Sequence, residues 1–350
     1  MIRVKFVGKG QTLADAPVWR RQLPTVAADQ LSVWGQCSFT FDPDARDYDW
    51  LVVYDDLPPQ GSERFSTRVE QLACPPEHTI FVTAEPSSIK TYGSAFLEQF
   101  GIIISSLEPW ATPAARTLHS QPGLRWYYGA PYSYKDNPAG LRSYDQLKAA
   151  QPEKTLNFST VCSNKRMKHT LHNKRVDFTD FIKSKIPELE IFGHGVRRID
   201  DKAEAIDAYR YHLAIENHIC PHHITDKLSD PLLGWALPFY IGAPNAADYI
   251  PADSFIALDI YKPDEAVEII RTAIANNEYE KRLPAIAKAR TLFLDELNIF
   301  ALLERTMTTR KPTPVRNGGK LVARRAMTTS SPLKALRFGL DCAWSKLHRL

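Results

Sequence analysis

The residue types that could do chemistry cluster just after one predicted strand. An apolar run at residues 213–215 is typical of a strand, and Asn217 follows it. Beyond a histidine-rich loop, Thr225 precedes Asp226 and Lys227 at the start of a segment with helical apolar spacing, so we expect Thr225 to cap a helix. These polar groups should therefore lie at the carboxyl edge of a sheet, beside a helix start. In open α/β sheets nucleotides bind at this edge.

The elements that position these residues are predicted to alternate between strand and helix. Short apolar, β-rich runs occur at residues 2–7, 50–54, 79–83, 101–104, 156–161 and 189–192. Residues 64–73, 200–211 and 263–277 are predicted to be helical, the last from apolar residues that recur on one face. Strands that alternate with helices imply parallel, doubly wound sheets. A length of 350 residues is typical of two domains. We predict an N-terminal Rossmann-like domain at residues 1–150, a nucleotide-binding Rossmann-like domain at 151–305 and a basic tail at 306–350.

Composition and cysteine usage indicate the class and compartment of the protein. The chain is 44% hydrophobic and 24% charged, which is ordinary for a globular protein. It contains no apolar run of about 18 residues, so no membrane-spanning helix is expected. The five cysteines are scattered and form no CxxC pair, which favours reduced thiols and a cytoplasmic location.

The formal net charge of +4 conceals an uneven distribution. Residues 305–350 hold 11 of the 44 Lys and Arg residues and only one of the 40 acidic residues, Asp341. The remainder of the chain is therefore mildly acidic. A basic tail could attract nucleic acid, but the chain carries no recognisable nucleic-acid-binding motif, so nucleic acid is not an expected partner.

The last residues of the chain predict a basic amphipathic helix. Five large apolar residues recur at spacings of three or four and are accompanied by Lys and Arg: Leu333, Leu336, Leu340, Trp344 and Leu347. Such a helix over residues 332–350 suits an anionic membrane surface, which would make the protein a peripheral membrane protein on the inner face. The alternative is a helix docked on the protein's own body. The polar residues 306–331 are expected to be disordered or extended.

The stretch described first resembles the signature of glycosyltransferase family 10, the α-1,3/1,4-fucosyltransferases. The matching segments, in order, are Ile215-Glu216-Asn217, Ile224-Thr225-Asp226-Lys227, Leu237-Pro238-Phe239, Gly242 and Ser254-Phe255-Ile256. Two residues depart from the family pattern, because His223 stands in place of the usual Tyr and Asp226 in place of the usual Glu. The resemblance implies a GT-B fold, in which two Rossmann-like domains face each other across a cleft. It also implies a GDP-fucose donor and a glycan acceptor.

The resemblance implies roles for residues of the second domain. Arg175 and Lys227 would stabilise the departing diphosphate, and Asn217 would bond to ribose or pyrophosphate. Asp226 would accept hydrogen bonds from ribose hydroxyls, although its side chain is one methylene shorter than that of the usual Glu. His223 would stack on the nucleotide or form a hydrogen bond with it. A second family-like segment adds three candidate donor-binding residues, which are Ser163, Asn164 and Gly193.

Glu85 is the candidate catalytic residue of the first domain. It follows the predicted strand at 79–83 and precedes Pro86, so its carboxylate should lie at the carboxyl edge of that sheet. An isolated Glu in such a place is most often simply solvated. The segment Ile80-Phe81-Val82-Thr83-Ala84-Glu85 is similar, however, to the family strand whose Glu is the proposed general base.

Two alternatives concern the metal and the reaction. His218, Cys220, His222 and His223 are potential zinc ligands, but four ligands so close on one loop rarely converge on one ion. We therefore expect an inverting, metal-independent transfer without a cofactor. The departures at His223 and Asp226 leave open a transferase that uses another nucleotide sugar, or a degenerate, non-catalytic sugar-nucleotide-binding protein.

Overall fold

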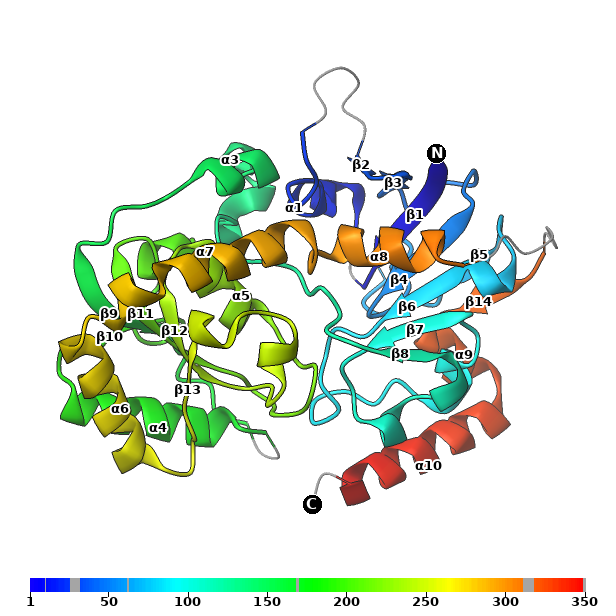
Figure 1. The fold of residues 1–350 in the computed structure, drawn as a ribbon. Helices are drawn as coiled ribbons and strands as arrows, with labels where there is room; N and C mark the ends of the chain where they lie inside the picture. The colour runs from blue at the N-terminus through cyan, green and yellow to red at the C-terminus, as the bar shows by residue number, and fades with distance from the viewer. Residues whose placement is uncertain (10, 26–31, 62, 168–169, 311–317, 349–350) are drawn as a thin grey trace. The chain divides into compact units, whose positions relative to one another are not determined.

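The computed structural model describes residues 1–350 except residues 10, 26–31, 62, 168–169, 311–317 and 349–350. The chain forms two compact units (Figure 1). Unit 1 comprises residues 1–122 and 300–350, and unit 2 comprises residues 123–299. Each unit is built on a mainly parallel sheet, which confirms the predicted pair of Rossmann-like α/β domains.

Unit 1 contains a seven-stranded sheet in the order β2-β3-β1-β4-β6-β7-β8. The strands are β1 (Ile2–Gly8), β2 (Val33–Trp34), β3 (Cys37–Thr40), β4 (Trp50–Tyr54), β6 (Thr79–Val82), β7 (Ile102–Ser105) and β8 (Thr117–His119). All neighbours pair in parallel except β2 and β3, which pair in antiparallel fashion. The central strands are buried on both faces, which explains their uninterrupted apolar sequences.

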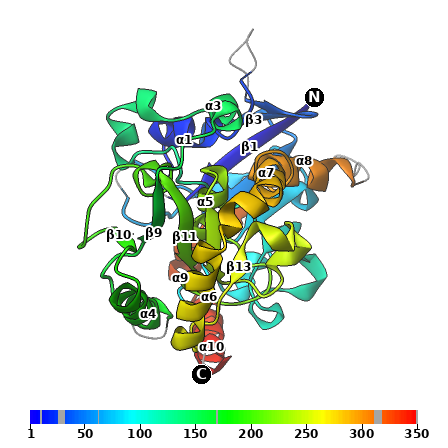
Figure 2. The ribbon, with the colours of Figure 1, turned by 60° about the vertical axis from the view of Figure 1, so that its left-hand side comes forward.

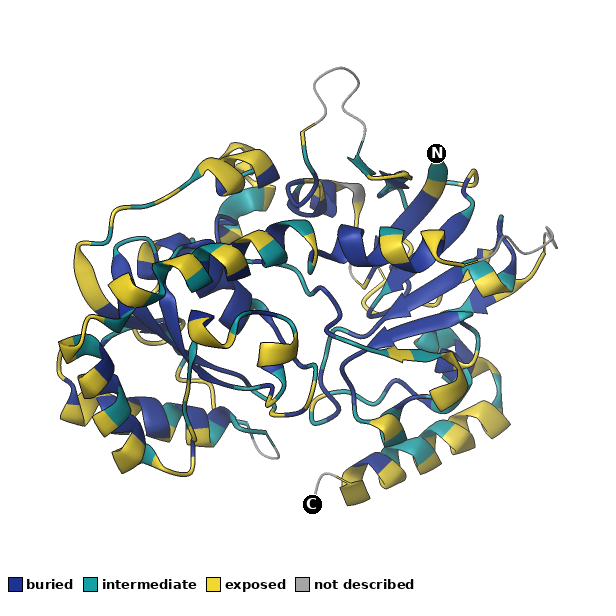
Figure 3. Cartoon of the chain, in the orientation of Figure 1, coloured by how far each residue is buried: buried dark blue, intermediate teal, exposed yellow. Residues whose placement is uncertain are grey.

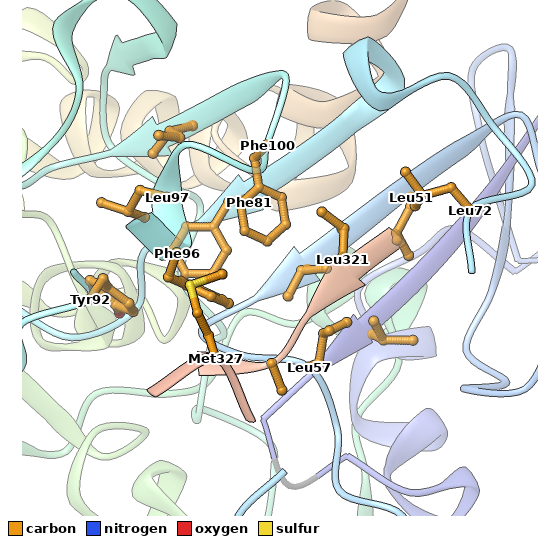
Figure 4. Close-up of a cluster of buried hydrophobic side chains, with 14 of the residues drawn as sticks. Leu51, Leu57, Leu72, Phe81, Tyr92, Phe96, Leu97, Phe100, Leu321 and Met327 are labelled. Carbon is orange, nitrogen blue, oxygen red and sulfur yellow. The ribbon is translucent and has the colours of Figure 1, made fainter. Parts of the chain in front are cut away.

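The main apolar core of unit 1 joins residues from both parts of the chain (Figure 4). Phe81 of β6 contacts Phe96 and Phe100, with ring centroids 5.3 and 4.9 Å apart. Phe96 lies on the short helix α2 (Ser94–Leu97). Leu321 and Met327 come from the far C-terminal part of the chain and are buried in the same cluster.

The prediction of a separate tail at 306–350 is therefore wrong. The described part of this segment continues α8 (Ile299–Thr308) and then forms β14 (Lys320–Val322), α9 (Arg324–Ser330) and α10 (Pro332–His348). Strand β14 pairs in antiparallel fashion with β5 (Val69–Gln71) of unit 1. The few apolar residues of the polar stretch, Leu321 and Met327 among them, are the ones that enter the core, and their burial outweighs the polar composition.

Unit 2 contains a five-stranded parallel sheet in the order β10-β9-β11-β12-β13. Its strands are β9 (Leu156–Val161), β10 (Glu190–Phe192), β11 (Tyr209–Ile215), β12 (Leu237–Ile241) and β13 (Ile256–Ala257). Its helices are α3 (Tyr144–Ala149), α4 (His172–Lys185), α5 (Asp226–Leu233), α6 (Pro263–Ala275) and α7 (Glu278–Asp295). Helix α4 lies beside α6, and α5 lies beside α7 (Figures 1 and 2).

The crossovers in unit 2 leave in opposite directions from two neighbouring strands. The chain passes from β9 outward to β10 through α4, and from β11 the other way to β12 through α5. Because such crossovers are right-handed, α4 and α5 belong to opposite faces of the sheet. The carboxyl ends of β9 and β11 therefore form a topological switch point, where α/β sheets bind ligands.

The boundaries between the two units differ from the predicted ones, which followed residues 150 and 305. In the structure the chain passes between units after residues 122 and 299. Residues 123–150 belong to unit 2, because Tyr128 and Arg142 bond to Asp207 at 2.5 and 2.8 Å. The indole of Trp235 also donates to the carbonyl of Ala150 at 2.8 Å. These polar contacts join residues far apart in sequence, which the local sequence around residue 150 does not indicate.

In the part of the chain that the structure describes, no helix is long and apolar enough to cross a membrane.

Candidate functional site

A cavity of about 540 Å³ opens at the switch point of unit 2. Its walls come from residues after β9, β10 and β11, from α4 and from the start of α5. Six of the eight predicted donor-binding residues line it, which are Ser163, Arg175, Gly193, Asn217, Asp226 and Lys227. The volume lies within the range of small-molecule sites.

Arg175 is fixed by contacts at both ends of its guanidinium. It lies in the first turn of α4, is largely buried, and donates to Asn217 Oδ1 at 2.6 Å. A second guanidinium nitrogen donates to the carbonyl of Val161 at 3.3 Å. Both partners are neutral acceptors, so they orient the guanidinium without neutralising its charge.

The start of α5 is built on a fully buried carboxylate. Glu216 accepts from the amide and the hydroxyl of Thr225, each at 3.0 Å through Oε1. Thr225 in turn caps the helix by accepting from the amide of Lys227 at 3.2 Å, as predicted. Burial raises the pKa of Glu216, and attraction to Lys227, whose Nζ lies 3.7 Å away, offsets part of that rise. Glu216 thus positions Lys227 through Thr225.

A partly buried lysine lines the cavity. Lys202 pairs with Asp226 and with Asp230, the latter at 2.7 Å. Burial alone would raise the pKa of Asp226, but attraction to Lys202 and Lys227 outweighs it and lowers that pKa. Burial raises the pKa of Asp230, and repulsion from Asp226 adds to that rise. Lys202 therefore holds the side chain of Asp226 in place.

The sequence analysis did not select Lys202, Asp230 or Arg198, although all three line the cavity. Asp230 lies four residues after Asp226 on α5, so the helical spacing could have indicated that they share a face. Lys202 lies in a short 3₁₀ helix, Lys202–Ala205, in a region predicted as a longer α-helix. No local pattern distinguishes it from a surface lysine.

Two predicted donor-binding residues do not line the cavity. His223 is buried in the loop before α5, where its ring contacts that of His218 at a centroid distance of 5.7 Å. Its amide also donates to the carbonyl of Cys220, which turns this loop inward. Asn164 is exposed and donates to the carbonyl of Gly195 at 3.3 Å. The structure therefore does not bring these two side chains to the cavity.

Gly193 and Gly242 allow the backbone to approach the site closely. Gly193 has a φ of 135°, and a Cβ there would lie 2.9 Å from the backbone of Cys162. A Cβ on Gly242 would lie 2.2 Å from the hydroxyl of Tyr240 and 2.6 Å from Glu216. A side chain at Gly242 would therefore displace the carboxylate that supports α5.

The histidine-rich loop is held by contacts within unit 2. Nδ1 of His222 lies 2.5 Å from the hydroxyl of Tyr249, and its amide donates to Asn245 at 2.7 Å. His222 has a φ of 67°, a conformation that these contacts maintain. The contacts give His222 a structural role in the loop.

Glu85 lies in unit 1, directly after β6, and its side chain is partly exposed. Its backbone is held by Tyr92, whose hydroxyl accepts from the amides of Ala84 and Glu85 at 3.0 and 3.1 Å. The same hydroxyl donates to Asp55 at 2.6 Å. Asp55, at a φ of 70°, also accepts from Lys90. Although burial favours its neutral form, attraction to Lys90 keeps the pKa of Asp55 below its usual value.

The sequence and the structure were compared with known proteins. Residues 151–282 match the model described as glycosyltransferase family 10 (fucosyltransferase) C-term. A chicken (Gallus gallus) GDP-fucose protein O-fucosyltransferase 3 is 36% identical over 78 residues, which cover 21% of this chain and 16% of the relative. A chimpanzee (Pan troglodytes) 4-galactosyl-N-acetylglucosaminide 3-alpha-L-fucosyltransferase 9 is 32% identical over 101 residues, 27% of this chain and 28% of the relative.

Among solved structures, an alpha1,3-fucosyltransferase with GDP-fucose is similar at a TM-score of 0.48 and 16% identity, over 89% of this chain and 91% of that one. The matches to the two curated relatives span less than a third of their lengths. The matched residues 151–282 contain every residue that lines the cavity of unit 2 except Tyr132. Through these residues, the chain is similar to the C-terminal part of glycosyltransferase family 10.

Proposed function

We propose that this protein is an inverting fucosyltransferase that moves fucose from GDP-fucose to a hydroxyl of a glycan. The observation that carries the proposal is the pair of cationic groups in the unit 2 cavity, Arg175 beside Asn217 and Lys227 at the start of α5. Both face a switch point, where α/β sheets bind nucleotides. The printed names of the matched relatives, which are fucosyltransferases, support the choice of sugar.

On the donor side, the leaving group is a diphosphate that gains negative charge as the bond to fucose breaks. Arg175 offers a planar fork of donors, and Lys227 offers a point charge at a helix start. The side-chain NH₂ of Asn217 donates to ribose or phosphate oxygens while its Oδ1 accepts from Arg175. Asp226 accepts from ribose hydroxyls, held in position by Lys202.

On the acceptor side, Glu85 acts as the general base. Its carboxylate takes the proton of the acceptor hydroxyl while that oxygen attacks the anomeric carbon of fucose. The bond from this carbon to the diphosphate oxygen breaks, and GDP leaves. A single displacement inverts the anomeric configuration. The network of Tyr92 and Asp55 keeps the backbone of Glu85 in place for this step.

In this proposal two side-chain cations and a helix start stabilise the leaving group, so no metal ion is required. The reaction is tested by incubating the full chain with labelled GDP-fucose and a panel of glycan acceptors, with and without EDTA. The proposal expects a fucosylated product with inverted configuration and full activity in EDTA. Loss of activity in EDTA that Mg²⁺ or Mn²⁺ restores would refute metal independence.

The same assay separates the alternatives. Transfer from another nucleotide sugar, but not from GDP-fucose, would reassign the donor. Tight binding of GDP-fucose, with neither transfer nor hydrolysis across the acceptor panel, would favour a non-catalytic binding protein. Absence of any GDP-fucose binding would overturn the proposal at the donor site itself.

A further inference from the structure

Helix α10 packs on unit 1 mainly through one face. Asp341 accepts from the amide of Ser94 at 2.7 Å, and Ser345 is buried on the same side. The ring of Phe338 lies against Gly93, where an added Cβ would be 2.7 Å from it. These residues recur at spacings of three and four, so they share a face of the helix. This inner face fixes how α10 lies on the unit.

The opposite face of α10 is apolar and exposed (Figure 3). Its residues and exposed fractions are Leu333 79%, Leu336 63%, Leu340 64%, Trp344 53% and Leu347 67%. We call these five residues the outer stripe. At 100° per residue they fall within one narrow sector, centred well away from the inner face. Trp344, at the edge of this sector, also lines a small pocket of unit 1 beside Trp110. Five of the fifteen exposed large hydrophobic residues of the described chain thus gather on one helix, whereas single exposed residues are ordinary.

The charges of α10 are predominantly positive. Lys334, Arg337 and Lys346 are exposed on the helix, and its one acidic residue, Asp341, is turned to the protein by its bonds to Ser94. Arg337 also holds Glu98 of unit 1, at 2.5 and 3.0 Å. Positive groups therefore flank the outer stripe near both ends of the helix.

We propose that α10 docks unit 1 flat onto an anionic lipid surface, with the outer stripe inserted among the acyl chains. From Leu333 to Leu347 the stripe extends roughly 20 Å along the helix axis, which suits a helix lying in the plane of the interface. Lys334 and Lys346 then meet lipid phosphates. Trp344, with an apolar ring and a polar N–H, suits the boundary between acyl chains and headgroups.

The main competing occupant of this face is a second copy of the chain. Two α10 helices related by a twofold axis run antiparallel or parallel. Lys334 of one copy would then approach Lys346 of the other in the first case, and each lysine would approach its own counterpart in the second. Like charges at both ends oppose that contact, whereas an anionic membrane satisfies the same charges. Charge complementarity therefore favours lipid.

The test uses the full chain in flotation assays with two kinds of vesicle, phosphatidylcholine alone and phosphatidylcholine mixed with phosphatidylglycerol. The apolar variant is L336Q/L340Q/W344Q. The matched control, L118Q/V196Q, removes exposed apolar residues that lie outside α10. The charge variant is K334Q/K346Q. None of these residues lines the unit 2 cavity, so GDP binding should be unchanged in all three and reports on the proposed function separately.

We expect the wild type to bind the mixed vesicles and the apolar variant to bind at least about tenfold more weakly, because three large apolar side chains no longer leave water. The charge variant should lose about tenfold on mixed vesicles and little on phosphatidylcholine. Vesicles with brominated acyl chains should quench part of the wild-type tryptophan fluorescence, and W344F should lack that component.

Three results would overturn the proposal. The first is no binding of the wild type to mixed vesicles. The second is equal binding by the wild type and an apolar variant that retains its fold by circular dichroism. The third is a wild type that sediments as a dimer and an apolar variant that sediments as a monomer, with neither protein binding vesicles. That result would assign the outer stripe to a second copy of the chain.

Discussion

The cations of the unit 2 cavity differ in how fully their charge is compensated. Lys202 is paired with two carboxylates. Arg175 donates to a neutral amide oxygen and a main-chain carbonyl. Lys227 lies 3.7 Å from Glu216 and 3.8 Å from Asp226, both farther than the 2.7 Å between Lys202 and Asp230. A bound diphosphate is therefore expected to draw its charge compensation from Arg175 and Lys227. Lys202 acts indirectly, by holding Asp226.

The role of Glu85 gives the first prediction. E85Q removes the proton acceptor but keeps the size of the side chain, so transfer should fall by about 100-fold or more. Affinity for GDP should stay the same, because the donor residues lie in unit 2. Initial rates and calorimetric titration with GDP measure the two effects. E77Q, at an exposed position of unit 1, is the matched control. A wild-type rate in E85Q would remove Glu85 from the mechanism.

His212 predicts how the stability of unit 2 depends on pH. It is buried beside the cavity, with Nδ1 2.9 Å from the hydroxyl of Ser159. Burial, with repulsion from Lys202 and Lys154, lowers the pKa of His212 from 6.5 to about 3. Between these values the unfolded chain binds a proton that the folded chain does not. The free energy of unfolding should therefore fall as pH drops through this range, by on the order of 1 kcal/mol per unit.

Denaturant unfolding of the wild type and H212N between pH 7 and 4 measures this contribution. Asn retains a polar group near the position of Nδ1 but does not titrate. H212N should be less stable at pH 7 and should show the shallower pH dependence. An identical slope in both proteins would show that His212 does not contribute, because other groups titrate equally in the two.

Residue-level prediction succeeded where a side chain follows directly from a local pattern. Asn217 at the end of β11, and Lys227 just after a capping Thr225, were predicted by strand and cap signals that lie within a few residues. His223 was misplaced because its burial depends on how the loop folds back, which no local pattern indicates. Lys202 was missed for the same reason, since only the tertiary structure brings it to Asp226 and Asp230.

At the scale of elements, the C-terminal strand β14 is a structural part of unit 1. It pairs with β5, about 250 residues earlier in the sequence, and places Leu321 in the core. Strand β5 also carries Glu70, whose buried carboxylate forms an ion pair with Lys5 of β1. Oε1 of Glu70 lies 2.7 Å from Nζ of Lys5. Breaking such a pair leaves an uncompensated buried charge. Strand β5 thus links β14 to the main sheet through a polar contact as well as through apolar ones.

The burial of Leu321 predicts how strongly its truncation lowers the free energy of unfolding, and the exposed Leu333 serves as the control. L321A should lower the free energy of unfolding by about 2–5 kcal/mol, because it leaves a cavity in a packed core. L333A, on the exposed stripe of α10, should change it by no more than about 0.5 kcal/mol. Chemical denaturation measures both. Equal, small effects would mean that β14 is not part of the folded unit.

The sequence predicted well those strands and helices in which apolar residues form a clear run or recur at regular spacing. Strand β9 has the predicted bounds, and α5, α6 and α10 were predicted from apolar spacing. The predicted helices at 64–73 and 200–211 were wrong. The first contains β5, whose strand partner is distant in sequence, and the second contains a 3₁₀ turn and the start of β11. The structure of both segments depends on partners that are distant in sequence. Local propensity carries no information about such partners.

At the scale of the whole molecule, unit 1 is discontinuous, because the chain leaves it at residue 122 and returns at residue 300. The sequence indicated two domains correctly from the alternation of strands and helices. It could not indicate that residues 300–350 rejoin the first domain, because their basic, polar composition resembles that of a solvated tail. The return of the chain is determined by a few buried apolar residues.

Two truncations test this organisation. A chain ending at Ser331 lacks α10 but retains β14 and α9, so unit 1 should remain folded and resist limited proteolysis. A chain ending at Arg310 lacks β14, Leu321 and Met327, and unit 1 should become protease-sensitive or fail to fold. Mass spectrometry of the protected fragments identifies the unit. Equal protection of unit 1 in both chains would contradict its discontinuous core.

Calorimetric titration of GDP into the wild type and into R175M/K227M decides whether Arg175 and Lys227 hold the diphosphate. We expect the wild type to bind GDP and the double variant to bind it at least about tenfold more weakly, because the variant has lost two charged donors to the diphosphate. R197M, which removes an exposed arginine of the same unit, should bind like the wild type. Absence of GDP binding by the wild type, or equal affinity in R175M/K227M, would contradict the account.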